Sequence, residues 1–439
     1  MRVRTGLVTL VTFVLAGAVA CTDSTADRSS SPAASTMAGH AAMGTPTTMA
    51  GHAGMSTPTT TVSGKGSPQQ LRVQFDQLLG RHALLAVRLM RSVVLAAPDF
   101  REAAVASLQD NTDALSEQVA SAYGAAQGER FQQLWQRHIT DLFAYANGVA
   151  GDDASAKQAA RTALMADADA YGSWVAGASK GRVQASDAAA GVRMHVEELM
   201  QQLDAYAARD YDKAYQIERA AYEHMFTSGA TLARGSVAPE LAVGLDAAPN
   251  KLRSAFSMLL AEHIELIIDA QRATFAGSPE FRAAAAQINA NSTALAHGLG
   301  AIVGPQKGAE FQSVWADHVD GLMAYTAAVA GKDQVGKAEA EGKLNKLAVD
   351  LAVYFSGIVR DQRAVVPLTG AVTMHDRHLT TQVDAYAVRD YAKAQQLELE
   401  GYQQMLGVAN TLVDAIQRSV KPGLPVGGSQ TGGGGTAHR

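Results

Sequence analysis

The chain has 439 residues, of which 47% are hydrophobic and 18% are charged, and its formal net charge is −5. This length leaves room for two or three domains. The weakly negative balance argues against nucleic acid or an anionic membrane surface as a partner. After the first twenty residues, no apolar run is long enough to cross a bilayer.

Residues 1–20 predict a signal peptide. Arg2 and Arg4 give it a positively charged start, and an apolar stretch follows at 7–19. The next residues, AVAC at 18–21, resemble a bacterial lipobox, which predicts a lipid on Cys21; ordinary signal-peptidase cleavage is the alternative. We therefore expect an exported lipoprotein on the outer face of the cell membrane or in the cell envelope, touching the membrane through its lipid anchor only. Because Cys21 is the only cysteine, any metal site must use His, Met, carboxylate or Tyr.

Residues 21–68 are rich in Ser, Thr, Gly, Ala and Pro, and they predict a disordered tether. Two units of the form Met-x-x-His-x-x-Met lie twelve residues apart within it. The six candidate metal ligands are Met37, His40, Met43, Met49, His52 and Met55. Thioethers combined with imidazole favour copper over zinc or iron. The alternative is a low-complexity linker in which local duplication copied these residues.

Residues 69–235 predict the first folded repeat, a helical bundle. Apolar residues recur at helical spacing, and Pro and Gly residues divide them into segments. Helices are expected at about 70–96, 99–122, 131–151, 153–176 and 187–207, with a last one after Asp210. Gly124 and Gly128 are expected to separate the second helix from the third.

The pattern restarts after a linker at 236–249. Residues 311–331 match 131–151 at ten of 21 positions, and 374–394 match 194–214 at 13 of 21. Residues 250–421 therefore predict a second bundle, and 422–439 a disordered tail. Neither half shows strand-like alternation. The predicted fold is all-α, with two tandem homologous antiparallel helical bundles.

Three histidines recur at matched positions in the two halves, each on the apolar stripe of a different helix. The pairs are His82 with His263, His138 with His318, and His195 with His375. Helices that each offer one imidazole to a shared core can form a metal site, and three histidines suit copper or zinc. Matched residues expected near such sites are Asn111, Asn291, Tyr145, Tyr325, Met225 and Met405. A purely structural hydrogen-bond network of His, Asn and Tyr is the alternative.

Three motifs carry a resemblance to a known family. They are Phe-x-x-Leu-Leu-x-x-His at 75–82 and 256–263, Phe-x-x-x-Trp-x-x-His followed by Tyr at 131–145 and 311–325, and Met-His-x-x-x-Leu at 194–199 and 374–379. Together they resemble secreted bacterial helical proteins commonly labelled copper amine oxidase-like. The resemblance implies an extracytoplasmic, copper-associated role for the matched histidines. True copper amine oxidases are β-rich and carry Asn-Tyr-Asp/Glu and His-x-His motifs, and neither motif occurs here.

The sequence therefore predicts an exported copper-binding protein that sequesters the ion or hands it on. A helical interaction or scaffold module of the cell envelope, with no metal, is the alternative. Copper is the expected cofactor, with zinc and haem left open. A metal- or haem-dependent redox enzyme is a third hypothesis, for which the sequence offers no catalytic motif. It identifies no protein partner.

Overall fold

Thirteen α-helices and a short 3-10 helix, with no strand, build residues 68–419, the part of the chain that this computed structural model describes. The all-α prediction is confirmed. The predicted signal peptide and the predicted tail at 422–439 lie outside the described residues. So do the candidate residues of the predicted tether: Cys21, Met37, His40, Met43, Met49, His52 and Met55.

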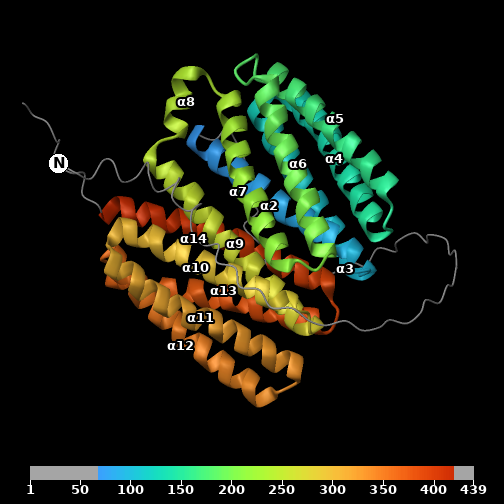
Figure 1. Cartoon of the computed structure of the whole chain (residues 1–439). Coiled ribbons are helices and arrows are strands. Elements are labelled where there is room, and N and C mark those ends of the chain that lie inside the picture. Colours follow the sequence, from blue (N-terminus) through green and yellow to red (C-terminus); the bar gives the residue numbers. More distant parts are fainter. Residues whose placement is uncertain (1–67, 420–439) are drawn as a thin grey trace, which may run out of the picture. The chain divides into compact units, whose positions relative to one another are not determined.

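Six long helices form each half of the described chain (Figure 1). The first half consists of α2 (Pro68–Val94), α3 (Pro98–Tyr123), α4 (Ala125–Ala150), α5 (Ala154–Ala178), α6 (Ala185–Ala207) and α7 (Tyr211–Ser236). The second half consists of α9 (Ala248–Ala276), α10 (Glu280–Val303), α11 (Pro305–Gly331), α12 (Gln334–Val359), α13 (Val365–Ala387) and α14 (Tyr391–Ser419). Between α12 and α13 lies the 3-10 helix η1 (Gln362–Ala364). In each half, helices adjacent in sequence pack together, and the last packs back on the first.

Helix ends follow from short polar side chains and from glycine. Asp153 caps α5 by accepting a hydrogen bond from the backbone of Ala156 at 2.9 Å, which satisfies an amide that has no partner within the helix. Gly124 turns the chain between α3 and α4 at a φ of 104°, a conformation that favours glycine. The prediction that Gly128 also separates these helices is wrong. It lies within α4, where a Cβ would come 2.6 Å from that of Ala120 on α3.

The segment predicted as a linker contains a helix of its own, α8 (Pro239–Leu245). Pro239 occupies its first turn, where a proline costs no hydrogen bond. Leu245, at the end of α8, is fully buried in the hydrophobic core of the first half. This burial explains why the segment folds despite its glycine and proline content.

Each half has a large hydrophobic core of its own. The first is drawn from residues between 75 and 245, and the second from residues 256–416 together with Tyr215. Helices α2 and α9 pack against each other, and every residue of 81–93 and 259–273 is buried. A helix covered on all sides is expected to be apolar, yet this contact includes buried charges. Arg88 on α2 is paired with Glu265 at 2.6 Å and with Glu398 of α14.

None of the helices in residues 68–419 combines the length and apolar character that a bilayer crossing requires.

Candidate metal centre

The three matched histidines of the first half meet inside their bundle. They come from three helices: His82 from α2, His138 from α4 and His195 from α6. Their ring centroids are 5.6 Å (His82 to His138), 5.7 Å (His82 to His195) and 5.9 Å (His138 to His195) apart. We call this group the first cluster.

The second half contains the same arrangement, the second cluster. It consists of His263 from α9, His318 from α11 and His375 from α13. The centroids are 5.9 Å (His263 to His318), 5.8 Å (His263 to His375) and 5.3 Å (His318 to His375) apart. In both halves, therefore, the helix packing brings the three imidazoles to one level of the bundle.

The six imidazoles are buried and almost without hydrogen bonds. None of them is more than 3% exposed. Among the described residues, only Nδ1 of His82 has a hydrogen-bond partner, and the other eleven ring nitrogens have none. A buried polar group without a partner costs about 1–3 kcal/mol. Two such groups of nitrogens are difficult to explain by packing alone, whereas a bound ion would satisfy one nitrogen of each ring.

Burial also keeps these rings neutral. It lowers the pKa of His138 and of His318 to about 4, and the pKa values of the other four histidines lie well below their usual range. The cause is the loss of hydration of the charged form, reinforced in those four by neighbouring imidazoles. Neutral imidazole is the form that binds a metal ion.

The ring nitrogens are close enough for a shared ion after a small adjustment. In each cluster, one nitrogen from each histidine lies within 4.8 Å of the corresponding nitrogens of the other two. Metal–nitrogen bonds of about 2.0–2.1 Å would require separations of about 3.4 Å. A small side-chain rotation of each histidine would bring the nitrogens from the first separation to the second. Three neutral nitrogen donors suit copper and zinc, and they leave a coordination position for a further ligand.

A tryptophan packs on each cluster, but the two tryptophans behave differently. Trp135 and Trp315 each lie 4.6 Å from an imidazole, His82 and His263 respectively, between ring centroids. The indole Nε1 of Trp135 donates a hydrogen bond to His82 Nδ1 at 3.1 Å. The indole nitrogen of Trp315 has no acceptor within residues 68–419.

The second cluster also contains a carboxylate that sequence reasoning missed. Asp376 is 5% exposed, and its Oδ1 lies 3.4 Å from His318 Nδ1, without the alignment of a hydrogen bond. Neither of its oxygens has a hydrogen-bond partner in the described part of the chain. Burial raises the pKa of Asp376 to about 8. A comparison of the two halves could have pointed to Asp376, because the matched position in the first half is Val196, a fully buried apolar residue.

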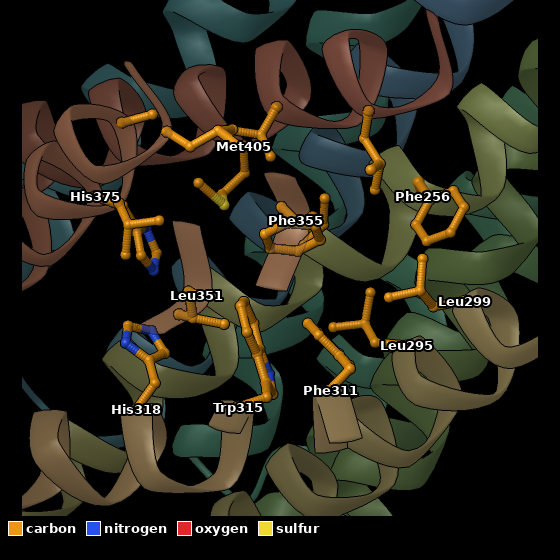
Figure 2. A pocket seen from close by; sticks show the side chains of 16 residues that line it. Phe256, Leu295, Leu299, Phe311, Trp315, His318, Leu351, Phe355, His375 and Met405 are labelled. Atoms are coloured by element: carbon orange, nitrogen blue, oxygen red, sulfur yellow. The ribbon is translucent and has the colours of Figure 1, made fainter. Parts of the chain in front are cut away.

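A small cavity adjoins each cluster. The one beside the second cluster has a volume of about 60 Å³, and His318, His375 and Met405 contribute to its lining. Figure 2 shows the rings of His318 and His375 facing each other beside Trp315, with Met405 lining the same space. The cavity beside the first cluster has about 40 Å³, and His195 and Met225 line it. Both predicted methionines are therefore next to the clusters.

The predicted asparagines and tyrosines bond elsewhere. Asn111 donates to the carbonyl of Leu78 at 3.1 Å, and Asn291 to that of Leu259 at 2.9 Å. Each of these carbonyls lies one turn before a cluster histidine on the same helix. Each asparagine therefore links its own helix to the helix that carries this histidine. Tyr145 and Tyr325 donate to Asp204 and Asp384, both at 2.9 Å. None of these hydrogen bonds involves an imidazole, so this part of the structure does not contain the His-Asn-Tyr network that was the alternative to a metal site.

The fold and the clusters thus define a helical protein with two buried groups of three histidines. Comparisons with protein-family models, with curated proteins and with solved structures find no match for this chain. The geometry of the two clusters and the sequence motifs are therefore the features that point to a function.

Proposed function

We propose that this chain binds one transition-metal ion at each histidine cluster, and that the metal is copper. One observation carries the proposal: in both halves, three buried neutral imidazoles from three helices converge within 4.8 Å, and eleven of their twelve nitrogens have no hydrogen-bond partner among residues 68–419. A bound ion would remove the free-energy cost of leaving these groups without partners.

The choice of copper rests on the donor types around the clusters. Imidazole alone suits zinc as well as copper. Met225 and Met405 line the cavities next to the clusters, and a thioether is a soft donor that favours Cu(I). The Met-x-x-His-x-x-Met units at 37–43 and 49–55 offer the same donors. Together these donors support a copper protein more than a zinc protein.

The biological role that we propose is sequestration or handover of copper outside the cytoplasm. It is supported by the signal-peptide pattern and by Cys21, which would carry the lipid anchor. The Met/His units would capture the ion, and the clusters would hold it. Mass spectrometry of the mature N-terminal peptide tests the anchor, since a diacylglyceryl group on Cys21 is expected. An unmodified Cys21 would contradict a lipoprotein.

Competition titration of the full-length protein with Cu(I), against a chelator of known affinity, tests metal binding. We expect His138→Gln to remove one tightly bound ion and His318→Gln to remove another. His297→Gln is the control, because His297 is exposed on α10, and it is expected to leave the stoichiometry unchanged. Micromolar or weaker binding that none of these variants alters would disprove the proposal. Tight binding of Zn(II) in preference to Cu(I) would retain the sites but reject copper.

A further inference from the structure

We infer that the two clusters have different roles: the first exchanges its ion with solvent, and the second retains it. This inference rests on the proposed metal binding and adds a division of labour to it. Three differences between matched positions support it, and all three act in the same direction.

The first difference is the route to the cluster. Asp187, Gly191 and Ser228 line the cavity beside the first cluster. The position of a Cβ on Gly191 would lie 4.0 Å from both Ser228 Oγ and His224 Nε2. Ser228 and His224 belong to α7, and the Nδ1 of His224 lies 3.2 Å from Glu198. A carboxylate, a hydroxyl and an imidazole at this rim can replace the water of a hydrated ion stepwise, which avoids the cost of complete dehydration.

In the second half, the matched positions that line the cavity are apolar, and the polar pair beside them, His378 and Gln404, is held together by a hydrogen bond of 2.9 Å. Ala371 and Val408 take the places of Gly191 and Ser228, and both line the cavity beside the second cluster. Gln404 replaces His224, and it donates a hydrogen bond to the carbonyl of Ala371 at 2.7 Å. This bond ties α14 to α13 at the rim. A hydrated ion meets no charged group among the residues lining this cavity before it reaches the histidines.

The second difference is charge inside the cluster. Asp376 places a carboxylate beside His318 in the second half, whereas Val196 holds the matched position in the first. A cation bound at the second cluster would favour the ionised form of this carboxyl group and so acquire a negative partner within the protein, as a buried charge requires. At the first cluster, Val196 offers no charge at this position, so less attraction opposes the departure of a cation.

The third difference is what replaces the ion when it leaves. In the first cluster, Trp135 donates a hydrogen bond to His82 Nδ1. This bond uses a nitrogen lone pair that a metal ion could otherwise take, so it partly compensates for the loss of the ion. Trp315 forms no such bond with His263, and the nitrogens of His263 have no hydrogen-bond partner in the described residues. Release from the second cluster therefore leaves more unsatisfied groups.

Release kinetics test the inference. Full-length protein loaded with Cu(I) is mixed with an excess of a chromophoric Cu(I) chelator, and the absorbance of the chelate is followed. We expect a fast and a slow phase that differ at least tenfold in rate. His138→Gln should abolish the fast phase and His318→Gln the slow one. A phase that survives both substitutions is assigned to the Met/His units at 37–55.

Substitutions at two of these matched positions provide the controls. Asp376→Asn is expected to accelerate the slow phase at least fivefold, and Ser228→Val to slow the fast phase by a similar factor. Neither change adds a charge to the core, so both variants should fold. Equal rates from the two clusters, or the opposite assignment of the phases, would overturn the inference while leaving two-site metal binding intact. If no ion binds to either cluster, the proposed function fails and the inference fails with it.

Discussion

The indole nitrogen of Trp135 donates a hydrogen bond to Nδ1 of His82 over 3.1 Å. In a neutral imidazole, one nitrogen carries the proton and the other the lone pair. A hydrogen bond accepted at Nδ1 therefore places the proton on Nε2, and neither nitrogen is then free to bind a metal ion. For His82 to act as a ligand, the ion must displace Trp135, or the ring must change its tautomer.

Trp135→Phe is consequently expected to strengthen metal binding at the first cluster. A net hydrogen bond contributes about 0.5–1.5 kcal/mol, so the gain in affinity should be about 2- to 13-fold. Competition titration in a His318→Gln background isolates this cluster. Trp315→Phe in a His138→Gln background is the matched control, with an expected change below about twofold, because Trp315 makes no hydrogen bond within the described residues. Equal weakening by both changes would show that indole packing matters and the hydrogen bond does not.

Acid is expected to destabilise the metal-free protein steeply. The pKa values of His138 and His318 fall from 6.5 in the unfolded chain to about 4 in the folded one. Between these values the unfolded chain binds more protons, so stability is present above pH 6.5 and is lost as the pH falls towards 4. Each histidine contributes at most about 1.4 kcal/mol per pH unit.

Urea unfolding at several pH values between 7.5 and 5 measures this slope. At the acid end of this range, the double variant His138→Gln, His318→Gln should have a slope shallower by up to about 2.7 kcal/mol per pH unit. The exposed control His297→Gln should match the parent protein. A slope that the double variant does not change would mean that these two rings are protonated in the folded state at pH 5.

The buried charges between the halves give a prediction on stability. Arg88 pairs with Glu265 and Glu398, and all three side chains are at most 4% exposed. Arg88→Met would leave two buried carboxylates without their cation, at a cost of about 3–5 kcal/mol in the free energy of unfolding. Urea denaturation measures this loss.

Two further variants test the cause of that loss. Adding Glu265→Gln and Glu398→Gln to Arg88→Met should recover part of the stability, because the two carboxylates are then uncharged, whereas the buried Arg81 loses the negative charges that balance it. Arg363→Met is the surface control, since Arg363 and its partner Asp361 are exposed, and it should change stability by less than about 0.5 kcal/mol. Failure of the added substitutions to restore stability would assign the loss to packing around Arg88.

Replacing a helical glycine by alanine should lower stability where the glycine is in close contact with another helix and raise it where the glycine is exposed. A Cβ on Gly229 of α7 would come 2.5–2.8 Å from atoms of Asp76 on α2. Gly229→Ala must therefore push these helices apart, and we expect a loss of about 1–3 kcal/mol. Gly342 of α12 is exposed and has no atom within 4 Å of its Cβ position, so Gly342→Ala should add about 0.5–1 kcal/mol. Thermal unfolding compares the two, and a Gly229→Ala protein as stable as its parent would contradict the close contact.

The sequence by itself predicts the helices and which faces of them are buried, because apolar periodicity and helix caps are local properties of the chain. Most helix ends agree with the predictions to within two or three residues, as for α6, expected at about 187–207 and found at Ala185–Ala207. The predictions fail at Gly128, which lies within α4, and at 239–245, which forms α8. At both places, packing against other helices outweighs the usual preference of glycine and proline for turns. The matched histidines were also visible in the sequence, since each recurs on an apolar stripe at an offset of about 180.

Only the tertiary structure decides whether those histidines meet. The regular turn of an α-helix fixes the direction in which a side chain points around its own helix. The height of that side chain relative to another helix depends on loop lengths and packing. The same reason hides Asp376, which lies beside His318 of α11 although it belongs to α13. It also hides the pairing of Arg88 with Glu398, 310 residues further along the chain. The sequence therefore supplies the ligands, and the packing of the helices decides which of them can share an ion.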